Sequence, residues 1–433
     1  MSNSTYKHLI LFTDSYPYGQ QETFLAEEFI YLTKEFDRIT IYPLYRADKK
    51  MRRQELWPGS YCKVETRGPL SRFSLKNKYL LLTRGIFNTS PVYFPESRFF
   101  KDKVFCSWRK FWLFMTSLLT IRAILSRKDI LRDITSNLKS ADTIYYYWGD
   151  RSILLLPYIK KIFMKQSDKF PFVITRFHGS DLYEEAKGYI PFRQQVFKNI
   201  DLACPISYDG ETYLKTRYPK QLKEIKAFRL GSAKGELKVN TNDETVFNIV
   251  SCSNVIPLKR VDIIAKAILS ISAQDFNSTA FKKLVWTHFG TGSDFAKLKH
   301  LTKRQGSDVK IHLKGQVSHD EVIDFYKNDV CDLFINASSS EGVPVSIMEA
   351  ISYGIPIIAT DVGGVSEIVN EKVGILLPKN TNSDIIKSEI IKFMHLSPEE
   401  MVLIRKAALQ EWSKSWDLSK NYSEFTEYIS QRS

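Results

Sequence analysis

The chain has 433 residues, which is too long for one hydrophobic core and suits two domains of about 200 residues each. Its 43% hydrophobic and 25% charged residues exclude a disordered or fibrous protein. The net charge of +14 comes from the first half, where residues 51–140 hold 18 basic and 6 acidic side chains. We therefore expect an anionic partner for this region: a membrane surface, a pyrophosphate-linked acceptor or, as the weakest alternative, nucleic acid.

The cysteines and the apolar stretches predict a cytoplasmic protein. The five cysteines are scattered without a C-x-x-C pair, which disfavours a disulfide framework and a zinc site. The N-terminus shows no signal-peptide cleavage pattern. The most lipid-like stretch, 111–121, is shorter than the roughly 18 apolar residues that a membrane span needs. No transmembrane helix is expected.

The first half begins with the rhythm of a parallel sheet. A strand at 8–12, a loop, a helix at 22–36 and a second strand at 39–44 form a βαβ unit. Residues 46–104 lose this rhythm and are rich in Pro, Gly, Arg and aromatics, so we expect a basic insertion over about 46–127. Helical patterns, strands at 143–147 and 172–177 and shorter units then complete a first domain over 1–233.

The second half repeats the strand and helix alternation more regularly. Strands are expected at 247–252, 283–289, 309–313, 331–335, 355–359 and 374–377. This pattern predicts a second doubly wound domain over 234–411, followed by a closing helix over 412–433. Ligands of such sheets bind beyond the carboxyl ends of the strands.

The most informative stretch is SSSEGVPVSIMEAISYGIPIIATDVGGVSEIV, which begins at Ser338. A strand ends in a loop that carries Glu341, a helix begins near Pro344, and Glu349 lies one to two turns into it. Free N–H groups at a helix start bind anions or sugar hydroxyls, and two flanking carboxylates accept hydrogen bonds from polyols. The alternative is that both glutamates are merely solvated.

This stretch closely resembles the signature of the family 4 retaining glycosyltransferases, E-G-x-P-x-S-x-x-E-A followed by G-x-P-(I/V)-I-A-T-D-V-G-G-x-x-E. The matching residues are Glu341, Gly342, Pro344, Ser346, Glu349, Ala350, Gly354, Pro356, Thr360, Gly363, Gly364 and Glu367. The resemblance implies an α/β GT-B fold, in which two Rossmann-like parallel-sheet domains face each other across a cleft. It also implies transfer of a hexose from a UDP- or GDP-sugar to a lipid-linked or polysaccharide acceptor, with retention and without a metal or other cofactor.

The resemblance also implies roles for residues of the donor site. Glu341 would hold the hydroxyls of the donor sugar, and Glu349 would bind the ribose. The backbone of Gly342, Val343, Pro344 and Val345 would approach the sugar. Gly290 and Gly292 match the glycine turn of the family, and Lys314, Gly315 and Gln316 match the strand end that meets the base.

A basic pair normally neutralises the pyrophosphate in this family, and this chain departs from that pattern. Lys259 fills the lysine position, but Ser253 and Asn254 stand where an arginine is expected. Arg260 or Arg229 would then supply the missing cation. The alternative for Lys259 is a solvated lysine at a helix start.

Two elements of the first half also resemble the family. The N-terminal loop keeps Gly19 but has Gln20 in place of a second glycine. FHGSD matches an H-G-x-D element, which makes His178 the candidate for stabilising the reacting centre. Asp181 either orients that imidazole or caps the next helix. The alternative for His178 is a purely structural histidine, and the alternative for Gly19 is a role in the turn alone.

Residues 105–127 place aromatics at helical spacing among arginines and lysines, which is typical of helices that dock onto anionic bilayers. A core-packed helix with a solvated polar edge is the alternative. We therefore expect an enzyme that is peripheral on the inner face of the plasma membrane and binds no nucleic acid. Two other functions stay open: a non-catalytic nucleotide-sugar-binding or scaffold protein, and another GT-B enzyme such as an α-glucan synthase.

Overall fold

The computed structural model describes residues 6–19, 22–46, 61–70, 104–237, 245–303 and 305–432. The chain divides into two compact units. The N-terminal unit comprises Met1–Ile206, Gly210–Phe228 and Tyr422–Ser433, and the C-terminal unit comprises Ser207–Asp209 and Arg229–Asn421.

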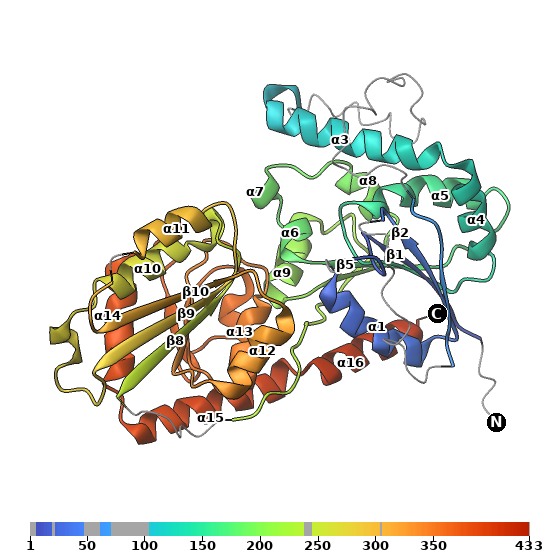
Figure 1. The fold of residues 1–433 in the computed structure, drawn as a ribbon. Helices are drawn as coiled ribbons and strands as arrows, with labels where there is room; N and C mark the ends of the chain where they lie inside the picture. Colours follow the sequence, from blue (N-terminus) through green and yellow to red (C-terminus); the bar gives the residue numbers. More distant parts are fainter. Residues whose placement is uncertain are drawn as a thin grey trace. The chain divides into compact units, whose positions relative to one another are not determined.

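The N-terminal unit is built on a parallel sheet with the strand order β3-β2-β1-β4-β5-β6-β7 (Figure 1). The strands are β1 (His8–Thr13), β2 (Arg38–Pro43), β3 (Lys63–Thr66), β4 (Thr143–Tyr146), β5 (Phe172–Phe177), β6 (Leu202–Pro205) and β7 (Glu224–Ile225). The central strands are apolar on both faces, as expected where helices cover both sides of a parallel sheet.

Helices cover both faces of this sheet (Figure 1). Those of the N-terminal unit are α1 (Thr23–Glu35), α3 (Trp108–Leu125), α4 (Lys128–Leu138), α5 (Leu156–Phe163), α6 (Gly179–Leu182), α7 (Glu184–Lys187), α8 (Arg193–Phe197), α9 (Tyr208–Arg217) and α16 (Leu418–Ser430). Side chains of α3, α4, α5, α8 and α9 pack with Ile10, Phe12 and Tyr146 in one core. Side chains of α1 and α16 pack with Leu9 and Leu11 in the other, so successive residues of β1 point to opposite cores.

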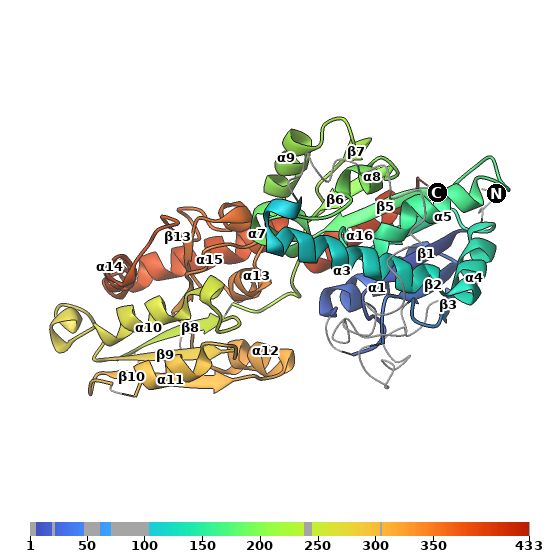
Figure 2. The same cartoon turned by 90° about the horizontal axis from the view of Figure 1, so that it is seen from above.

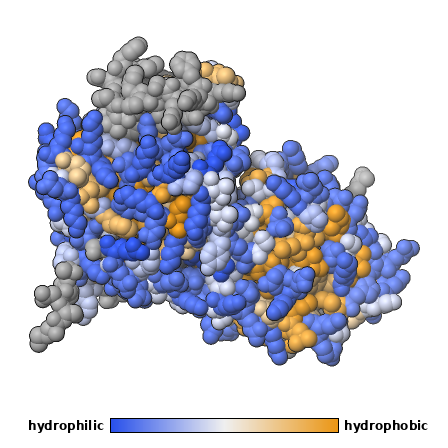
Figure 3. All heavy atoms as spheres, turned by 180° about the vertical axis from the view of Figure 1, so that it is seen from behind, coloured by the Kyte–Doolittle hydropathy of each residue, from blue (hydrophilic) through white to orange (hydrophobic). Residues whose placement is uncertain are grey.

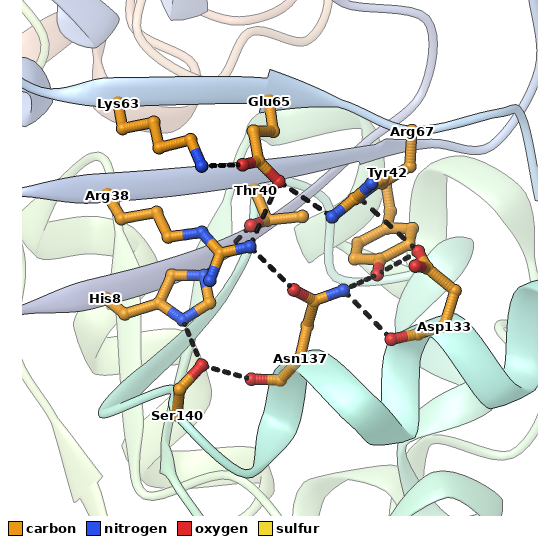
Figure 4. Close-up of polar contacts among 10 residues, drawn as sticks. All are labelled: His8, Arg38, Thr40, Tyr42, Lys63, Glu65, Arg67, Asp133, Asn137 and Ser140. Atoms are coloured by element: carbon orange, nitrogen blue, oxygen red, sulfur yellow. Dashed lines mark hydrogen bonds and ion pairs between the residues drawn. The ribbon is translucent and has the colours of Figure 1, made fainter.

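Polar side chains attach β3 and α4 to the edge of the sheet (Figure 4). Glu65 of β3 accepts hydrogen bonds from Arg38 at 3.0 Å and from Arg67 at 2.7 Å. Asn137 of α4 accepts a bond from Arg38 at 3.1 Å and donates one to the hydroxyl of Tyr42 at 3.0 Å. The hydrogen bond from Lys63 and the charges of Arg38 and Arg67 lower the pKa of Glu65 to about 2. Ion pairs thus hold the short strand β3 in addition to its pairing with β2 and the packing of Val64 against the core.

The C-terminal unit contains a second parallel sheet, with the order β10-β9-β8-β11-β12-β13. Its strands are β8 (Val246–Cys252), β9 (Lys283–Phe289), β10 (Val309–Gly315), β11 (Leu333–Asn336), β12 (Ile357–Thr360) and β13 (Gly374–Leu377). Its helices are α10 (Val261–Leu269), α11 (Phe295–Leu301), α12 (His319–Asn328), α13 (Val345–Ser352), α14 (Ser383–Met394) and α15 (Pro398–Ser415). Helices α10, α11 and α14 share one core with the strands, and α13 packs against α15, β11 and β12 (Figures 1 and 2).

The strands of both sheets follow the sequence pattern, with shifts of one or two residues at several ends. Three strands were not predicted: β3 lies inside the expected insertion, and β6 and β7 are short. The chain leaves the first unit after Phe228 and returns to it at Tyr422, whereas the sequence pattern placed the end of the first domain at 233. The expected closing helix over 412–433 instead contains the end of α15 and the whole of α16. Much of the expected insertion, namely 47–60 and 71–103, lies outside the described residues.

Apolar side chains reach the surface in both units. Phe105 and Trp108, at the start of α3, are 64% and 73% exposed. The view from behind also shows apolar side chains gathered on the C-terminal unit, at the right of Figure 3, among mostly polar surroundings. No helix in the described part of the chain has the length and apolar character that a membrane span requires.

Candidate functional site

The candidate donor site lies at the carboxyl edge of the C-terminal sheet. All six strands are parallel, so the loops that follow β8, β9, β10, β11 and β12 leave the same edge. These loops carry most residues of the C-terminal half that the sequence motifs singled out for the donor site; Lys314 and Gly315 end β10, and Val345 and Glu349 lie in α13. The edge is where doubly wound sheets bind their ligands.

Lys259 and Glu341 meet at this edge. The Nζ atom of Lys259 donates to Oε1 of Glu341 at 2.5 Å, and Nδ2 of Asn336 donates to the same oxygen at 3.3 Å. The two charged side chains are 20% and 8% exposed. The lysine is therefore not a solvated helix-start residue. It is held against the first carboxylate of the motif.

Arg260 ties the loop after β8 to the loop after β11. Its backbone is left-handed, with φ of 48°, and its guanidinium donates to the carbonyls of Ala337 at 2.7 Å and Ser338 at 3.3 Å. The amide of Ser339 donates to the carbonyl of Leu258 at 2.8 Å and closes the same joint. The guanidinium of Arg260 is thus engaged with backbone carbonyls. These contacts fix the loop that carries Glu341.

Arg229, the second candidate for the missing cation, is engaged in a different place. Its guanidinium carbon lies 4.5 Å from the ring centre of Tyr208 and 4.6 Å from that of Trp416. Its Nη2 lies 3.6 Å from Oε2 of Glu367, whose other oxygen accepts from the amide of Asp209 at 2.9 Å. Arg229 and Glu367, the last residue of the motif, therefore hold the segment 207–209 to the C-terminal unit.

Two glycines of the motif support the backbone of Glu341. Gly363 has φ of +55°, and a Cβ atom there would lie 2.1 Å from the carbonyl oxygen of Glu341. The amide of Gly364 donates to the carbonyl of Gly342 at 2.7 Å. Only glycine allows this approach at a positive φ, so the glycine pair determines where the Glu341 loop runs.

The helix α13 begins directly after this loop. Its N-cap is Pro344, whose side chain cannot accept a hydrogen bond from the first-turn amides of Val345 and Ser346. Partial positive charge is therefore concentrated beside Glu341. The sequence placed Pro344 near the first helical position, and the structure makes Val345 the first helical residue.

Glu349 lies within α13, and its side chain is 11% exposed. Its Oε1 lies 2.7 Å from Nε2 of His319, the first residue of α12. Burial and the charge of Glu349 raise the pKa of the Cys252 thiol at the end of β8 to about 12, and the charge of Lys259 opposes this shift. Both charged groups thus lie within electrostatic reach of the same strand end. Sequence reasoning missed His319, because a lone histidine carries no signal of its contact.

The glycine turn after β9 packs against the loop after β8. A Cβ atom on Gly290 would lie 1.9 Å from the carbonyl oxygen of Ser253, and one on Gly292 would lie 2.3 Å from that of Val255. The amide of Gly290 donates to the carbonyl of Gly315, which has φ of 72°. The turn therefore fixes the ends of β8, β9 and β10 together. Three side chains nearby are exposed: Asn254, Lys314 and Gln316.

His178 follows β5 in the N-terminal unit and is buried between aromatic rings. Its ring centre lies 4.8 Å from that of Tyr147 and 4.5 Å from that of Trp148. Among the residues that the structure describes, neither ring nitrogen has a hydrogen-bond partner. Burial and the charge of Arg176 lower the pKa of His178 to about 3. The imidazole is therefore neutral near pH 7.

Asp181 acts on the backbone near His178. Its carboxylate accepts from the amides of His178 and Gly149, each at 2.6 Å. Of the two roles left open by the sequence, capping of the next helix matches these bonds, since the Nδ1 atom of His178 lies 3.9 Å away. Burial raises the pKa of Asp181 to about 7, and the charge of Asp150 adds to this shift.

Gly19 lies in the loop after β1, with φ of +74°. Glu22 anchors this loop, because its carboxylate accepts from the amides of Ser15 at 2.7 Å and Tyr16 at 2.6 Å and from the indole of Trp148 at 2.8 Å. The loop after β1 is therefore joined to the loop after β4. Gln20, which replaces the second glycine of the family, lies outside the described residues.

The two units thus hold different parts of the candidate set. Lys259, Glu341 and Glu349 lie in the C-terminal unit with the glycine turns, and His178 and Gly19 lie in the N-terminal unit. Among the residues that the structure describes, no three His, Cys, Asp or Glu side chains come together as metal ligands would.

Comparisons with known proteins identify the kind of enzyme. The family described as "Glycosyl transferases group 1" matches residues 234–410. An uncharacterized glycosyltransferase of Methanocaldococcus jannaschii is 28% identical over 59% of this chain and 67% of its own length. WcaL of Escherichia coli, named as a colanic acid biosynthesis glycosyltransferase, is 25% identical over 55% of this chain and 59% of its own.

Solved structures extend the likeness to the whole chain. HepE of Anabaena, solved in complex with UDP, has a TM-score of 0.62 and 16% identity and covers 98% of this chain and 100% of its own. HepE was also solved with UDP-glucose. The GT-B fold expected from the sequence is confirmed, and the chain is a transferase enzyme, a glycosyltransferase.

Proposed function

We propose that this glycosyltransferase moves a hexose from a nucleotide-diphosphate sugar, UDP- or GDP-linked, to a lipid-linked or polysaccharide acceptor with retention of configuration. The donor would bind at the carboxyl edge of the C-terminal sheet. Glu341 would hold the hydroxyls of the donor sugar, Glu349 would bind the ribose, and Lys259 would face the diphosphate.

The contact between Lys259 and Glu341 carries this proposal. A nucleotide-sugar site needs an acceptor for sugar hydroxyls next to a cation for the leaving diphosphate, and this pair supplies both within 2.5 Å. The uncapped first turn of α13 adds amide donors beside them. The alternative of two solvated glutamates does not fit a Glu341 that is 8% exposed and bound to two partners.

The similar proteins support the substrate class. HepE binds UDP and UDP-glucose in its solved complexes, and WcaL is named for the biosynthesis of colanic acid. A UDP- or GDP-hexose and a glycan acceptor are therefore the substrates to test first.

The chemistry that we propose needs no metal ion and no other cofactor. Negative charge grows on the leaving diphosphate as the bond to the sugar breaks. Lys259 and the amides of Val345 and Ser346 would balance that charge while the acceptor attacks the same face of the sugar. His178, which is neutral and has no hydrogen-bond partner on its ring nitrogens in the described part of the chain, would stabilise the reacting centre. Transfer should therefore persist in EDTA.

A binding and turnover experiment on the purified full chain tests the proposal. Calorimetry with UDP, GDP and ADP selects the base, and release of nucleoside diphosphate from the matching sugars measures turnover. NMR of the product reports its anomeric configuration. Glu341→Gln should reduce turnover by at least about 100-fold, as expected for a group that binds the transition state. Glu389→Gln, in a surface pair with Lys392, is the matched control.

The other two functions predict different results. Nucleotide binding without turnover on any acceptor, together with no effect of Glu341→Ala in cells, would identify a non-catalytic nucleotide-sugar-binding protein. Transfer to α-glucan chains, in preference to lipid-linked acceptors, would identify an α-glucan synthase.

We also propose that the start of α3 docks onto an anionic membrane. Phe105, Trp108, Phe111 and Trp112 form one cluster, with ring centres 5.7 to 6.0 Å apart. An exposed aromatic cluster in a strongly basic region matches the chemistry of an anionic bilayer surface. The enzyme would then act as a peripheral protein on the inner face of the plasma membrane.

Vesicle co-sedimentation tests the docking. The protein should bind vesicles that contain anionic phosphatidylglycerol and not pure phosphatidylcholine, and Trp108→Ser should reduce binding. Leu403→Ser removes a similarly exposed apolar side chain, 67% exposed, from the other unit and is the matched control. Equal binding to both vesicles, or equal loss in both variants, would contradict the proposal.

A further inference from the structure

His319 contacts the carboxylate that the proposed function assigns to the ribose. Its Nε2 lies 2.7 Å from Oε1 of Glu349, and the two side chains are 53% and 11% exposed. An ionised carboxylate only accepts hydrogen bonds, so Nε2 carries the proton and donates it. The contact joins α12 to α13 across 30 residues of sequence.

The backbone around His319 holds the imidazole in place. Ser318 caps α12, because its hydroxyl accepts from the amide of Glu321 at 3.2 Å. The turn before it begins at Gly315, whose carbonyl accepts from the amide of Gly290 at 2.9 Å. The first residue of α12 is therefore positioned by both a helix cap and the end of the sheet.

Glu349 also acts electrostatically on two tyrosines. Burial raises the pKa of Tyr326 on α12 well above its ordinary value, and that of Tyr353 after α13 is raised in the same way. Both phenols therefore stay neutral near pH 7. The hydroxyl of Tyr326 is buried and has no hydrogen-bond partner among the described residues. The exposed imidazole of His319 thus contacts a carboxylate that is itself largely buried.

We propose that His319 is a positioning residue for ribonucleotide recognition: it orients Glu349 so that the carboxylate meets the vicinal hydroxyls of a ribose. A side chain already held in its binding orientation loses less rotamer freedom when the ligand arrives. His319 lies three residues after Gln316, which the sequence motif assigns to the base. One short segment would therefore contact the base and also orient the carboxylate that binds the ribose. This inference rests on the proposed function.

The preference for ribose over 2′-deoxyribose tests the inference. We expect the full-length enzyme to bind UDP, or GDP if that is its nucleotide, at least about tenfold more tightly than the 2′-deoxy form, as for a hydrogen bond to a charged group. His319→Ala should reduce this ratio to about threefold or less. His319→Gln, whose amide also donates, should keep more of it. His300→Ala, on the surface of α11, is the control and should leave the ratio unchanged.

The outcomes separate the two proposals. An equal loss of affinity for both nucleotides in His319→Ala would show a merely structural role and overturn the inference, as would an unchanged ratio. A wild-type enzyme that binds both forms equally would overturn it too. Each of these results leaves the donor site standing, whereas a wild-type enzyme that binds no nucleoside diphosphate at all would overturn the proposed function as well.

Discussion

The ammonium group of Lys259 lies 2.5 Å from the carboxylate of Glu341, although 82 residues of sequence separate them. The lysine stands in the turn after β8 and the glutamate in the loop after β11, two strands that are neighbours in the sheet. In the proposed function, Lys259 pairs with the negatively charged diphosphate, and the Glu341 carboxylate accepts hydrogen bonds from the sugar hydroxyls. A nucleotide sugar must therefore replace this contact, at least in part, when its diphosphate and sugar hydroxyls arrive.

We expect Lys259→Ala to reduce turnover by about 100- to 1,000-fold, because the cation balances charge that develops as the diphosphate departs. Lys266→Ala is the matched control, since Lys266 makes an exposed pair with Asp262 on α10. Steady-state kinetics and calorimetry with the nucleoside diphosphate measure the effect. Turnover that is the same in both variants would exclude Lys259 from the reaction.

Gly363→Ala should weaken nucleotide-sugar binding by at least about tenfold although it leaves every charged group intact. The new Cβ would lie 2.1 Å from the carbonyl oxygen of Glu341, and φ of +55° costs an alanine roughly 1–2 kcal/mol. The loop that carries Glu341 must therefore shift. Gly306→Ala is the control, because a Cβ there would meet no heavy atom within 4 Å. Donor affinity that is equal in the two variants would show that the loop tolerates the displacement.

The regular strands could be predicted from the sequence because their apolar runs are long and bounded by turns. β9 and β5 lie where the pattern placed them, for this reason. β3 could not be predicted, because its four residues, KVET, contain only one apolar side chain and lie within a basic stretch. Its place depends on Arg38 and Asn137, which are distant in sequence.

The part of the candidate site that comes from one loop and the helix after it could be predicted from the sequence. Glu341, Gly342 and Glu349 follow one another along a single motif, so local spacing placed them together. The contacts of Lys259 with Glu341 and of His319 with Glu349 could not be inferred. They depend on the order of the strands in the sheet and not on spacing along the chain. The structure also places the guanidinium of Arg260 on backbone carbonyls, a contact that residue type alone does not reveal.

Glu28→Ala should destabilise the N-terminal unit by about 3–5 kcal/mol, because it leaves the guanidinium of Arg176 buried without its counter-charge. The Arg176 Nε lies 3.3 Å from Glu28 Oε2, and both side chains are fully buried. Denaturant unfolding measures the loss. The double variant Glu28→Leu with Arg176→Leu should recover much of it, since apolar side chains replace both charges. A single variant as stable as the wild type would show that Arg176 finds another partner or water.

His8 should make the N-terminal unit less stable in mild acid. Its side chain is buried at the start of β1, where Nδ1 lies 3.0 Å from the hydroxyl of Ser140 and Nε2 lies 2.9 Å from that of Thr40 (Figure 4). Burial and the charge of Arg38 lower the pKa of His8 from 6.5 to about 4. The unfolded chain therefore binds a proton at this residue between pH 6.5 and pH 4 that the folded protein does not bind.

The contribution of His8 to stability is therefore fully present above pH 6.5 and is lost as the pH falls toward 4, by at most about 1.4 kcal/mol per pH unit. Unfolding free energies of the wild type and His8→Gln, measured at pH 7.5 and pH 5, isolate this effect because every other titrating group is common to both proteins. At pH 5 the unfolding free energy of His8→Gln should be higher relative to that of the wild type than it is at pH 7.5. His395→Gln, on the surface at the end of α14, is the comparison variant. A difference between wild type and His8→Gln that is the same at both pH values would mean that the folded protein takes up the proton as readily as the unfolded chain.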